Sequence, residues 1–188
     1  MMRFGSLRSA VAVLFVVAVC AGCGSSDSSK SSDSSKVSAS HYVSAVCSAI
    51  SPLEKDVVTR SSALNNTTAA NAIEAKKTLQ GFLTAIEQDS AHALSKIQSA
   101  GTPDISGGRA VAGTIVKAFT EMRDAMKAAL TKSNSLPTDS PTAFKTAARA
   151  LGASVRDSLN NIDSSGLSNP DLERAAAGQA ACKSLSNG

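Results

Sequence analysis

The chain has 188 residues, of which 19 are Lys or Arg and 15 are Asp or Glu, and its formal net charge is +4. Two of the basic residues, Arg3 and Arg8, belong to an N-terminal segment that we expect to be removed, which leaves a charge of only +2. Such a small excess does not favour a nucleic-acid partner, and 3% aromatic residues, with no Trp and one Tyr, provide few side chains on which bases or sugars could stack.

Residues 1–22 have the layout of an export signal. Arg3 and Arg8 supply a positive n-region, and residues 10–21 form an apolar run. A run of about a dozen residues is too short to cross a bilayer as a helix. We therefore expect residues 1–22 to be a cleaved signal peptide.

The end of this segment, Ala21-Gly22-Cys23, resembles the lipobox of bacterial lipoproteins. In that family the cysteine thiol receives a diacylglyceryl group, and a peptidase then cuts the chain just before it. The resemblance implies lipidation of Cys23, with palmitate-type acyl chains, and a protein held on the extracytoplasmic face of the cell membrane, because two acyl chains anchor firmly where one does not. The family commonly has Leu at the position of Cys20; lipidation at Cys20 and an ordinary secretory cut nearby are the alternatives.

After Cys23 the chain carries a duplicated hexapeptide, Ser-Ser-Asp-Ser-Ser-Lys, at residues 25–30 and 31–36. The repeat has no apolar residue to bury, so residues 23–39 are predicted to be a disordered linker. About sixteen residues of flexible chain span roughly 20 Å on average. The linker therefore leads from the anchor to a folded domain predicted over residues 40–188.

The composition of residues 40–188 favours a single all-α domain. Ala, Leu, Lys, Glu and Gln are abundant, and apolar residues recur every three to four positions. The first helix carries its apolar stripe over residues 42–57. Within it, Ser51-Pro52-Leu53-Glu54 has the pattern of a capping box with Pro at the first helical position, which predicts a kink or a restart at Ser51. Residues 65–68 end the pattern.

The periodic pattern predicts four more helices, with apolar stripes over residues 73–100, 111–130, 141–162 and 170–185. Asp104 or Ser106 is expected to cap the third helix. Ser140 and Asn169, each followed by Pro, are expected to open the fourth and the fifth. Short connections make neighbouring helices antiparallel. The predicted fold is therefore an up-down four-helix bundle with an additional short C-terminal helix.

Cys47 and Cys182 are the two cysteines that remain once Cys20 has left with the signal and Cys23 is acylated. Disulfides form and persist outside the reducing cytosol, so we expect these two to pair and to join the first helix to the last. A redox-active pair or a metal site is disfavoured, because the two cysteines are far apart in the chain and no Cys-x-x-Cys occurs.

Candidate sites for chemistry are few. Phe119, Met122 and Met126 share one helix face and could line an adaptable apolar pocket, or they could simply belong to the core. Asp89 and His92 also share a face, but a second such pair is missing, so a solvated surface pair is favoured over a di-metal site. No catalytic residue, metal site or cofactor is predicted. Lys76 and Lys77 are expected to be exposed.

The layout of lipobox, Ser-rich linker, Ala-rich helical domain and one cysteine pair resembles small exported lipoproteins of high-GC Gram-positive bacteria. The resemblance implies work at the cell envelope. We expect a non-enzymatic module that binds an envelope protein or component and is tied to the membrane by its lipid anchor. The alternative is a carrier or sensor of a small apolar ligand held between helices near Phe119, Met122 and Met126.

Overall fold

The computed structural model describes residues 35–66, 69–163 and 168–186. The predicted signal peptide, Cys23 and the linker up to residue 34 lie outside the described residues. The elements of the described part are, in chain order, β1 (Lys36–Val37), α1 (Ala39–Asn66), α2 (Ala72–Gln98), β2 (Thr102–Pro103), α3 (Gly108–Ser133), α4 (Pro141–Asn160), α5 (Pro170–Ala177) and α6 (Ala180–Ser186).

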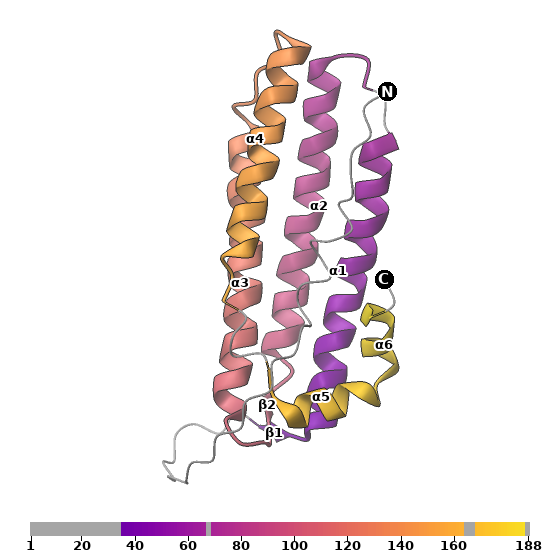
Figure 1. Ribbon diagram of the computed structural model, residues 1–188, viewed down its shortest axis with the longest axis vertical. Coiled ribbons are helices and arrows are strands. Elements are labelled where there is room, and N and C mark those ends of the chain that lie inside the picture. Colours follow the sequence, from indigo (N-terminus) through magenta and orange to yellow (C-terminus); the bar gives the residue numbers. More distant parts are fainter. Residues whose placement is uncertain (1–34, 67–68, 164–167, 187–188) are drawn as a thin grey trace. The chain divides into compact units, whose positions relative to one another are not determined.

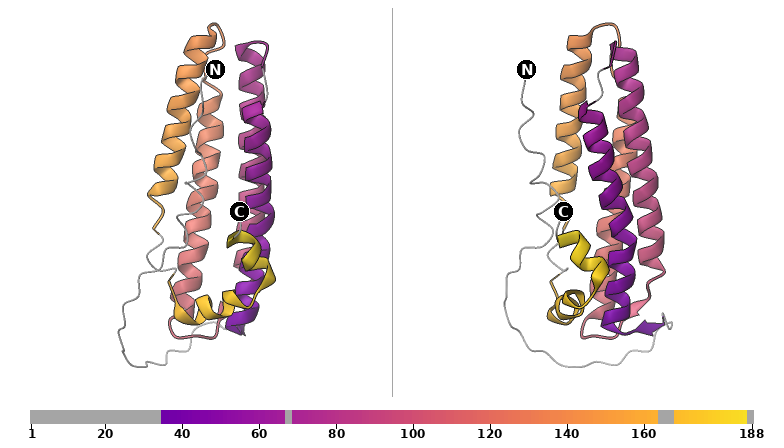
Figure 2. Two further views of the ribbon diagram at one scale, coloured as in Figure 1. Left: turned by 45° about the vertical axis from the view of Figure 1, so that its right-hand side comes forward. Right: turned by 90° about the vertical axis from the view of Figure 1, so that its right-hand side faces the viewer.

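The four long helices, α1 to α4, lie side by side, and those that follow one another in the chain run in opposite directions (Figure 1). Helix α2 packs against α1 and α3, and α3 also packs against α4. Helix α5 crosses the lower end of this bundle, and α6 turns up along α1 (Figures 1 and 2). The all-α prediction is confirmed. We call the end with β1, β2 and α5 the base, and the opposite end, where α2 and α4 begin, the tip.

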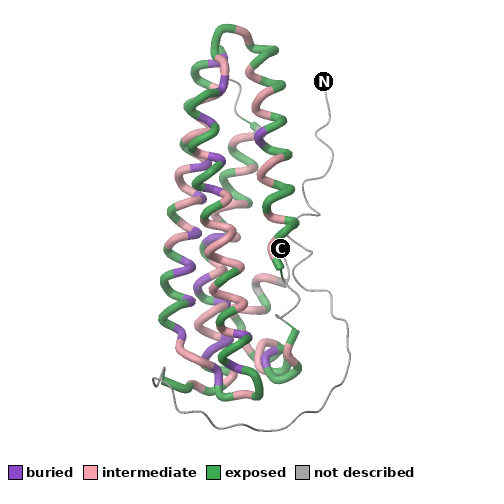
Figure 3. Tube along the Cα trace, turned by 90° about the vertical axis from the view of Figure 1, so that its left-hand side faces the viewer, coloured by how far each residue is buried: buried purple, intermediate pink, exposed green. Residues whose placement is uncertain are grey.

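Three clusters of buried apolar side chains follow one another from base to tip, and Figure 3 shows buried positions recurring along the helices between exposed ones. The base cluster contains Tyr42, Val43, Cys47, Ala100, Val111 and Leu172. The middle cluster contains Leu53, Ile86, Ala93 and Met126. The tip cluster contains Leu83, Ala129, Leu136 and Leu151. Ile73, which the predicted stripe placed inward, is 65% exposed, because α2 begins at Ala72 and buries that residue instead.

Helix α1 continues through Pro52, so of the kink or restart predicted at Ser51 the restart is wrong. A proline inside a helix removes one backbone donor, which would otherwise bond to the carbonyl of Ser48. Pro52 and Ser48 are both exposed, so water can solvate that carbonyl. The apolar residues Ala49 and Leu53, one turn apart on either side of the proline, meanwhile stay buried on the same face.

The Pro-containing helix starts are confirmed, but the start of α3 is not as predicted. Ser140 Oγ accepts from Ala143 N in α4, and Asn169 Oδ1 accepts from two backbone amides of α5. Helix α3 is preceded by Gly107, with φ of 69° and no side-chain cap. Gly108 packs so closely on Pro103 that a Cβ would lie 2.0 Å from the Pro103 carbonyl oxygen. This tight turn takes the place of a cap from Asp104 or Ser106.

The C-terminal segment forms two short helices rather than the single one predicted. Helix α5 ends at Ala177, and α6 begins at Ala180 after Gly178 and Gln179. The break at these two residues lets α6 change direction, so that both helices pack on α1. Leu172 of α5 is buried in the base cluster.

The last part of the predicted linker belongs to the folded domain. Strands β1 and β2 pair in parallel, with Thr102 N donating to Ser35 O (3.3 Å) and Asp104 N donating to Val37 O (2.7 Å). Lys36 Nζ lies 3.2 Å from Asp104 Oδ1. From Ser35 onward the chain is therefore attached to the base of the bundle.

Lys76 of α2 holds the connection between α3 and α4. Its Nζ donates to Asn134 O (2.7 Å) and to Leu136 O (3.1 Å), and Gln80 Nε2 donates to Asn134 Oδ1 (2.9 Å). Carbonyls at the end of a helix lack partners within the helix and carry partial negative charge, which a cation stabilises. Lys76 was expected to be exposed, but it is partly buried at this contact, whereas its neighbour Lys77 is exposed.

We predict that Lys76→Ala destabilises the protein, because two carbonyls lose a charged donor and the helix end loses a compensating charge. The expected cost is about 1 kcal/mol, which lowers the Tm by about 3 °C for a domain of this size. Thermal unfolding followed by circular dichroism measures it. Lys77→Ala is the matched control and should leave the Tm unchanged; equal effects of the two substitutions would contradict the role of Lys76.

Candidate functional site

The three side chains predicted as possible ligand-lining groups lie in the core of the bundle. Met126 is 6% exposed, and Phe119 and Met122 are partly buried. All three pack in the middle cluster, together with Leu53 of α1 and Ile86 of α2. Neither of the two hollows described below includes any of them.

The larger hollow lies at the tip. It has a volume of about 200 Å³ and is open to solvent. It is lined by Leu64 from α1, by Ala69, by Ala75, Thr78 and Leu79 from α2, and by Phe144 and Ala148 from α4. Apart from Thr78 this lining is apolar, so the hollow suits a small apolar group better than a charged one. Sequence reasoning missed it, because it forms only where three helices meet.

A smaller hollow of about 20 Å³ lies between α3 and α4. Its lining includes Ala125, Ala129 and Val155, and Lys132 Nζ donates to Ser154 Oγ (3.2 Å) beside it. A space of this size holds little more than one water molecule. It is therefore a packing gap rather than a binding site.

A charged cluster connects α1 and α2. Arg60 Nε donates to Asp56 Oδ2 (2.9 Å) on α1, and Asp89 of α2 interacts with Asp56. Burial raises the pKa of Asp89, and the like charge of Asp56 and a hydrogen bond between the two carboxyl groups raise it further, while Arg60 and His92 act in the opposite direction. The Oδ2 atom of Asp89 is buried and has no partner among the described residues. The sequence predicted that both Asp89 and His92 are solvated. Asp89 is partly buried, contrary to that prediction, whereas His92 is exposed.

The charged cluster contains two carboxyl groups, those of Asp56 and Asp89, and the guanidinium of Arg60. Within residues 35–66, 69–163 and 168–186, no group of three or more His, Cys, Asp or Glu side chains could hold a metal ion. The like charge of Asp56 favours the protonated form of Asp89. His41, the other histidine, is exposed, and its backbone amide donates to Ser38 Oγ (3.2 Å) at the start of α1.

Tyr42 places a phenol inside the base cluster. The residue is 1% exposed, and its hydroxyl has no hydrogen-bond partner among the described residues. Burial raises the pKa of Tyr42 to about 12, so the phenol is neutral at physiological pH. The ring supplies packing area, while the unpaired hydroxyl costs stability.

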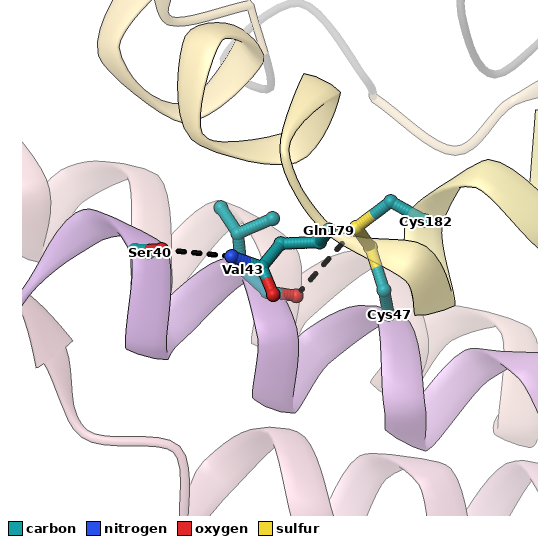
Figure 4. The surroundings of a disulfide bond; sticks show 5 residues. All are labelled: Ser40, Val43, Cys47, Gln179 and Cys182. Atoms are coloured by element: carbon teal, nitrogen blue, oxygen red, sulfur yellow. Dashed lines mark hydrogen bonds between the residues drawn. A yellow bond between two sulfur atoms is a disulfide. The ribbon is translucent and has the colours of Figure 1, made fainter.

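The predicted disulfide between Cys47 and Cys182 is confirmed, with an S–S distance of 2.02 Å and a Cα–Cα distance of 5.1 Å. It joins α1 to α6 at the edge of the base cluster (Figure 4). Gln179 Nε2 donates to Ser40 Oγ (2.8 Å) beside it. The Cys182 sulfur lies 3.9 Å from Val43 O; this is a contact rather than a hydrogen bond, because a disulfide sulfur carries no proton.

We predict that replacing both cysteines by Ala lowers the stability of the oxidised protein. The bond closes a loop of sequence separation 135, for which the chain-entropy relation gives at most about 5 kcal/mol. Ala avoids burying a new polar group at residue 47. The measurement is the Tm with and without a phosphine reductant. Reductant should lower the Tm of the unchanged protein to that of the variant and leave the variant unaffected; an unchanged Tm in both cases would contradict a stabilising bond.

We predict that Asp89→Asn raises the Tm at pH 7. The pKa of Asp89 is raised in the folded state, so the folded protein binds more protons than the unfolded chain between the unfolded and folded pKa values, and stability falls as the pH rises through that range. The gain should therefore disappear near pH 3, where the carboxyl group is protonated in both states.

Thermal unfolding at the two pH values measures this gain. Asp139→Asn, at an exposed residue before α4, controls for the simple loss of one negative charge. Asp56→Asn should reproduce part of the gain, because it removes the neighbouring charge. A gain of equal size at pH 3 and pH 7 is the result that would overturn this account of the pair.

The described residues therefore offer an apolar hollow at the tip, two interacting carboxyl groups on α1 and α2, and a disulfide at the base. Among the described helices, none combines the length and the apolar composition that a membrane-spanning segment needs. Comparisons of the chain with known protein families, with curated proteins and with solved structures find no match.

Proposed function

We propose that this chain is a lipoprotein, anchored through Cys23 on the extracytoplasmic face of the cell membrane, whose helical domain is a non-enzymatic binding module at the cell envelope. The sequence Ala21-Gly22-Cys23 at the end of an apolar run carries the anchor. The disulfide supports export, because such bonds persist outside the reducing cytosol. After processing, Cys23 is the first residue, and the Ser-rich segment connects it to the bundle.

The tip supports the binding role. Of the described large apolar side chains, Val58 and Ile73 are the exposed ones, at 55% and 65%. Val58 lies in the half of α1 nearer the tip, and Ile73 lies at the first turn of α2, close in the chain to the hollow residues Ala69 and Ala75. These two exposed side chains and the apolar hollow are the surfaces that a partner could cover.

The second candidate is a carrier of a small apolar ligand, and the hollow of about 200 Å³ is the observation that favours it. The ligand would then lie against Leu79 and Phe144 at the tip rather than against Met122 and Met126. Native mass spectrometry of the mature protein distinguishes the two roles: a co-purifying small molecule that is lost in Leu79→Gln supports a carrier. A photoreactive residue at position 73 that crosslinks to an envelope component in cells, while the protein itself is free of ligand, supports a binding module.

We predict that Cys23→Ala abolishes membrane retention and signal processing, because the thiol that accepts the lipid is missing. Cell fractionation and the intact mass of the mature protein measure both effects. Cys20→Ala is the matched control, since it removes the neighbouring thiol of the same apolar run and should leave lipidation and retention unchanged. Retention of the Cys23 variant in the membrane fraction, at the same mature mass minus one sulfur, would refute the anchor.

A further inference from the structure

Strand β1 fixes the place where the chain leaves the folded domain toward Cys23. The pairing of β1 with β2, the ion pair between Lys36 and Asp104 and the start of α1 at Ala39 all hold Ser35 at the base. Any pull on the chain from residue 34 therefore acts on the base of the bundle. It does not act on the tip, which lies at the other end of α1.

Gly101 is required for this attachment. Its φ of +84° is one that L side chains rarely adopt, and a Cβ there would lie 2.9 Å from Ser35 O and 3.3 Å from Val37 Cγ1. The backbone of residues 35–37 thus passes over a position that has no side chain. A larger residue at position 101 would push β1 away from β2.

The length of the remaining tether limits where the base can be. Twelve peptide links join Cys23 to Ser35 in the sequence, and twelve links reach at most about 40 Å. Helix α2, with 27 residues, is about 40 Å long. A rod that is attached by one end near an impenetrable surface has more allowed orientations with its free end away from the surface than with its free end toward it. The tip is the free end of the bundle, so on average it lies farther from the surface than the base.

The base and the tip also differ in the polarity of their side chains, and the difference fits a base that lies nearer the membrane. Ion pairs at the base join Lys36 to Asp104 and Arg174 to Asp171, so this end suits a polar, hydrated surface without inserting into it. The hollow and the exposed Ile73 lie at the tip.

We infer that the base is the membrane-proximal end of the bundle and that the tip, with its apolar hollow, is turned away from the bilayer. This inference rests on the lipid anchor at Cys23 proposed above. A partner would accordingly meet the hollow on the side of the domain that faces away from the lipid. The pairing of β1 with β2 attaches the lipid-anchored segment to the bundle.

Limited trypsin digestion of the full mature lipoprotein tests whether β1 is attached to the bundle. The bond after Lys36 should be cut at least roughly tenfold more slowly than the bond after Lys30, which follows the same hexapeptide. In Gly101→Ala this difference should shrink, whereas Gly113→Ala should preserve it, since a Cβ at that exposed helical glycine meets nothing within 4 Å. Equal cleavage after Lys30 and Lys36 in the unchanged protein would contradict the attachment of β1 to the bundle.

Energy transfer to a headgroup acceptor tests the orientation, with the mature lipoprotein reconstituted in neutral phosphatidylcholine vesicles. One dye is attached through Ser106→Cys at the base and another through Thr138→Cys at the tip, both at exposed residues, with the native disulfide left oxidised. We expect transfer at least about twofold greater from residue 106 than from residue 138. Transfer that is equal, or greater from residue 138, in protein that floats with the vesicles overturns the orientation but leaves the anchor intact. Protein that does not float overturns both.

Discussion

The covalent link between Cys47 and Cys182 is the constraint on which the base of the bundle depends. Helices α5 and α6 have eight and seven residues, too few to be stable alone in water. They keep their structure by packing on α1, and the disulfide keeps them there. Leu172 of α5 in turn covers one side of the base cluster, which contains Tyr42 and lies next to the point where β1 enters. The two ends of the described chain thus stabilise each other.

Local signals in the sequence were sufficient for the helices that carry them. Ser140-Pro141 and Asn169-Pro170 bring the capping side chain and the fixed φ into two adjacent residues, so the starts of α4 and α5 could be predicted without tertiary information. The same reasoning failed at Pro52, whose local pattern also suggests a helix start. There the apolar face of α1 continues on both sides of the proline, and the burial of that face outweighs the loss of one hydrogen bond.

The features that sequence reasoning missed depend on contacts between distant residues. Strand β1 has two residues and pairs with a strand that lies 66 positions later, so it leaves no periodic pattern to detect. Lys76 meets the α3 end across 58 and 60 positions, and Asp89 meets Asp56 only because α1 and α2 pack in one particular register. The hollow likewise needs Leu64, Leu79 and Phe144 from three helices. For Phe119, Met122 and Met126, periodicity predicted a shared face correctly, but it could not distinguish a packed core from a pocket.

The position of the disulfide along the chain has a consequence for the order of folding. A chain that emerges from its N-terminus first exposes Tyr42, Val43 and Cys47 long before Cys182, which follows 135 residues later. Throughout that interval the α1 surface that α5 and α6 cover has no partner from its own chain, and Cys47 cannot yet pair with Cys182. The base is therefore the last part of the bundle to be completed, and its apolar residues on α1 stay uncovered until the C-terminal helices follow.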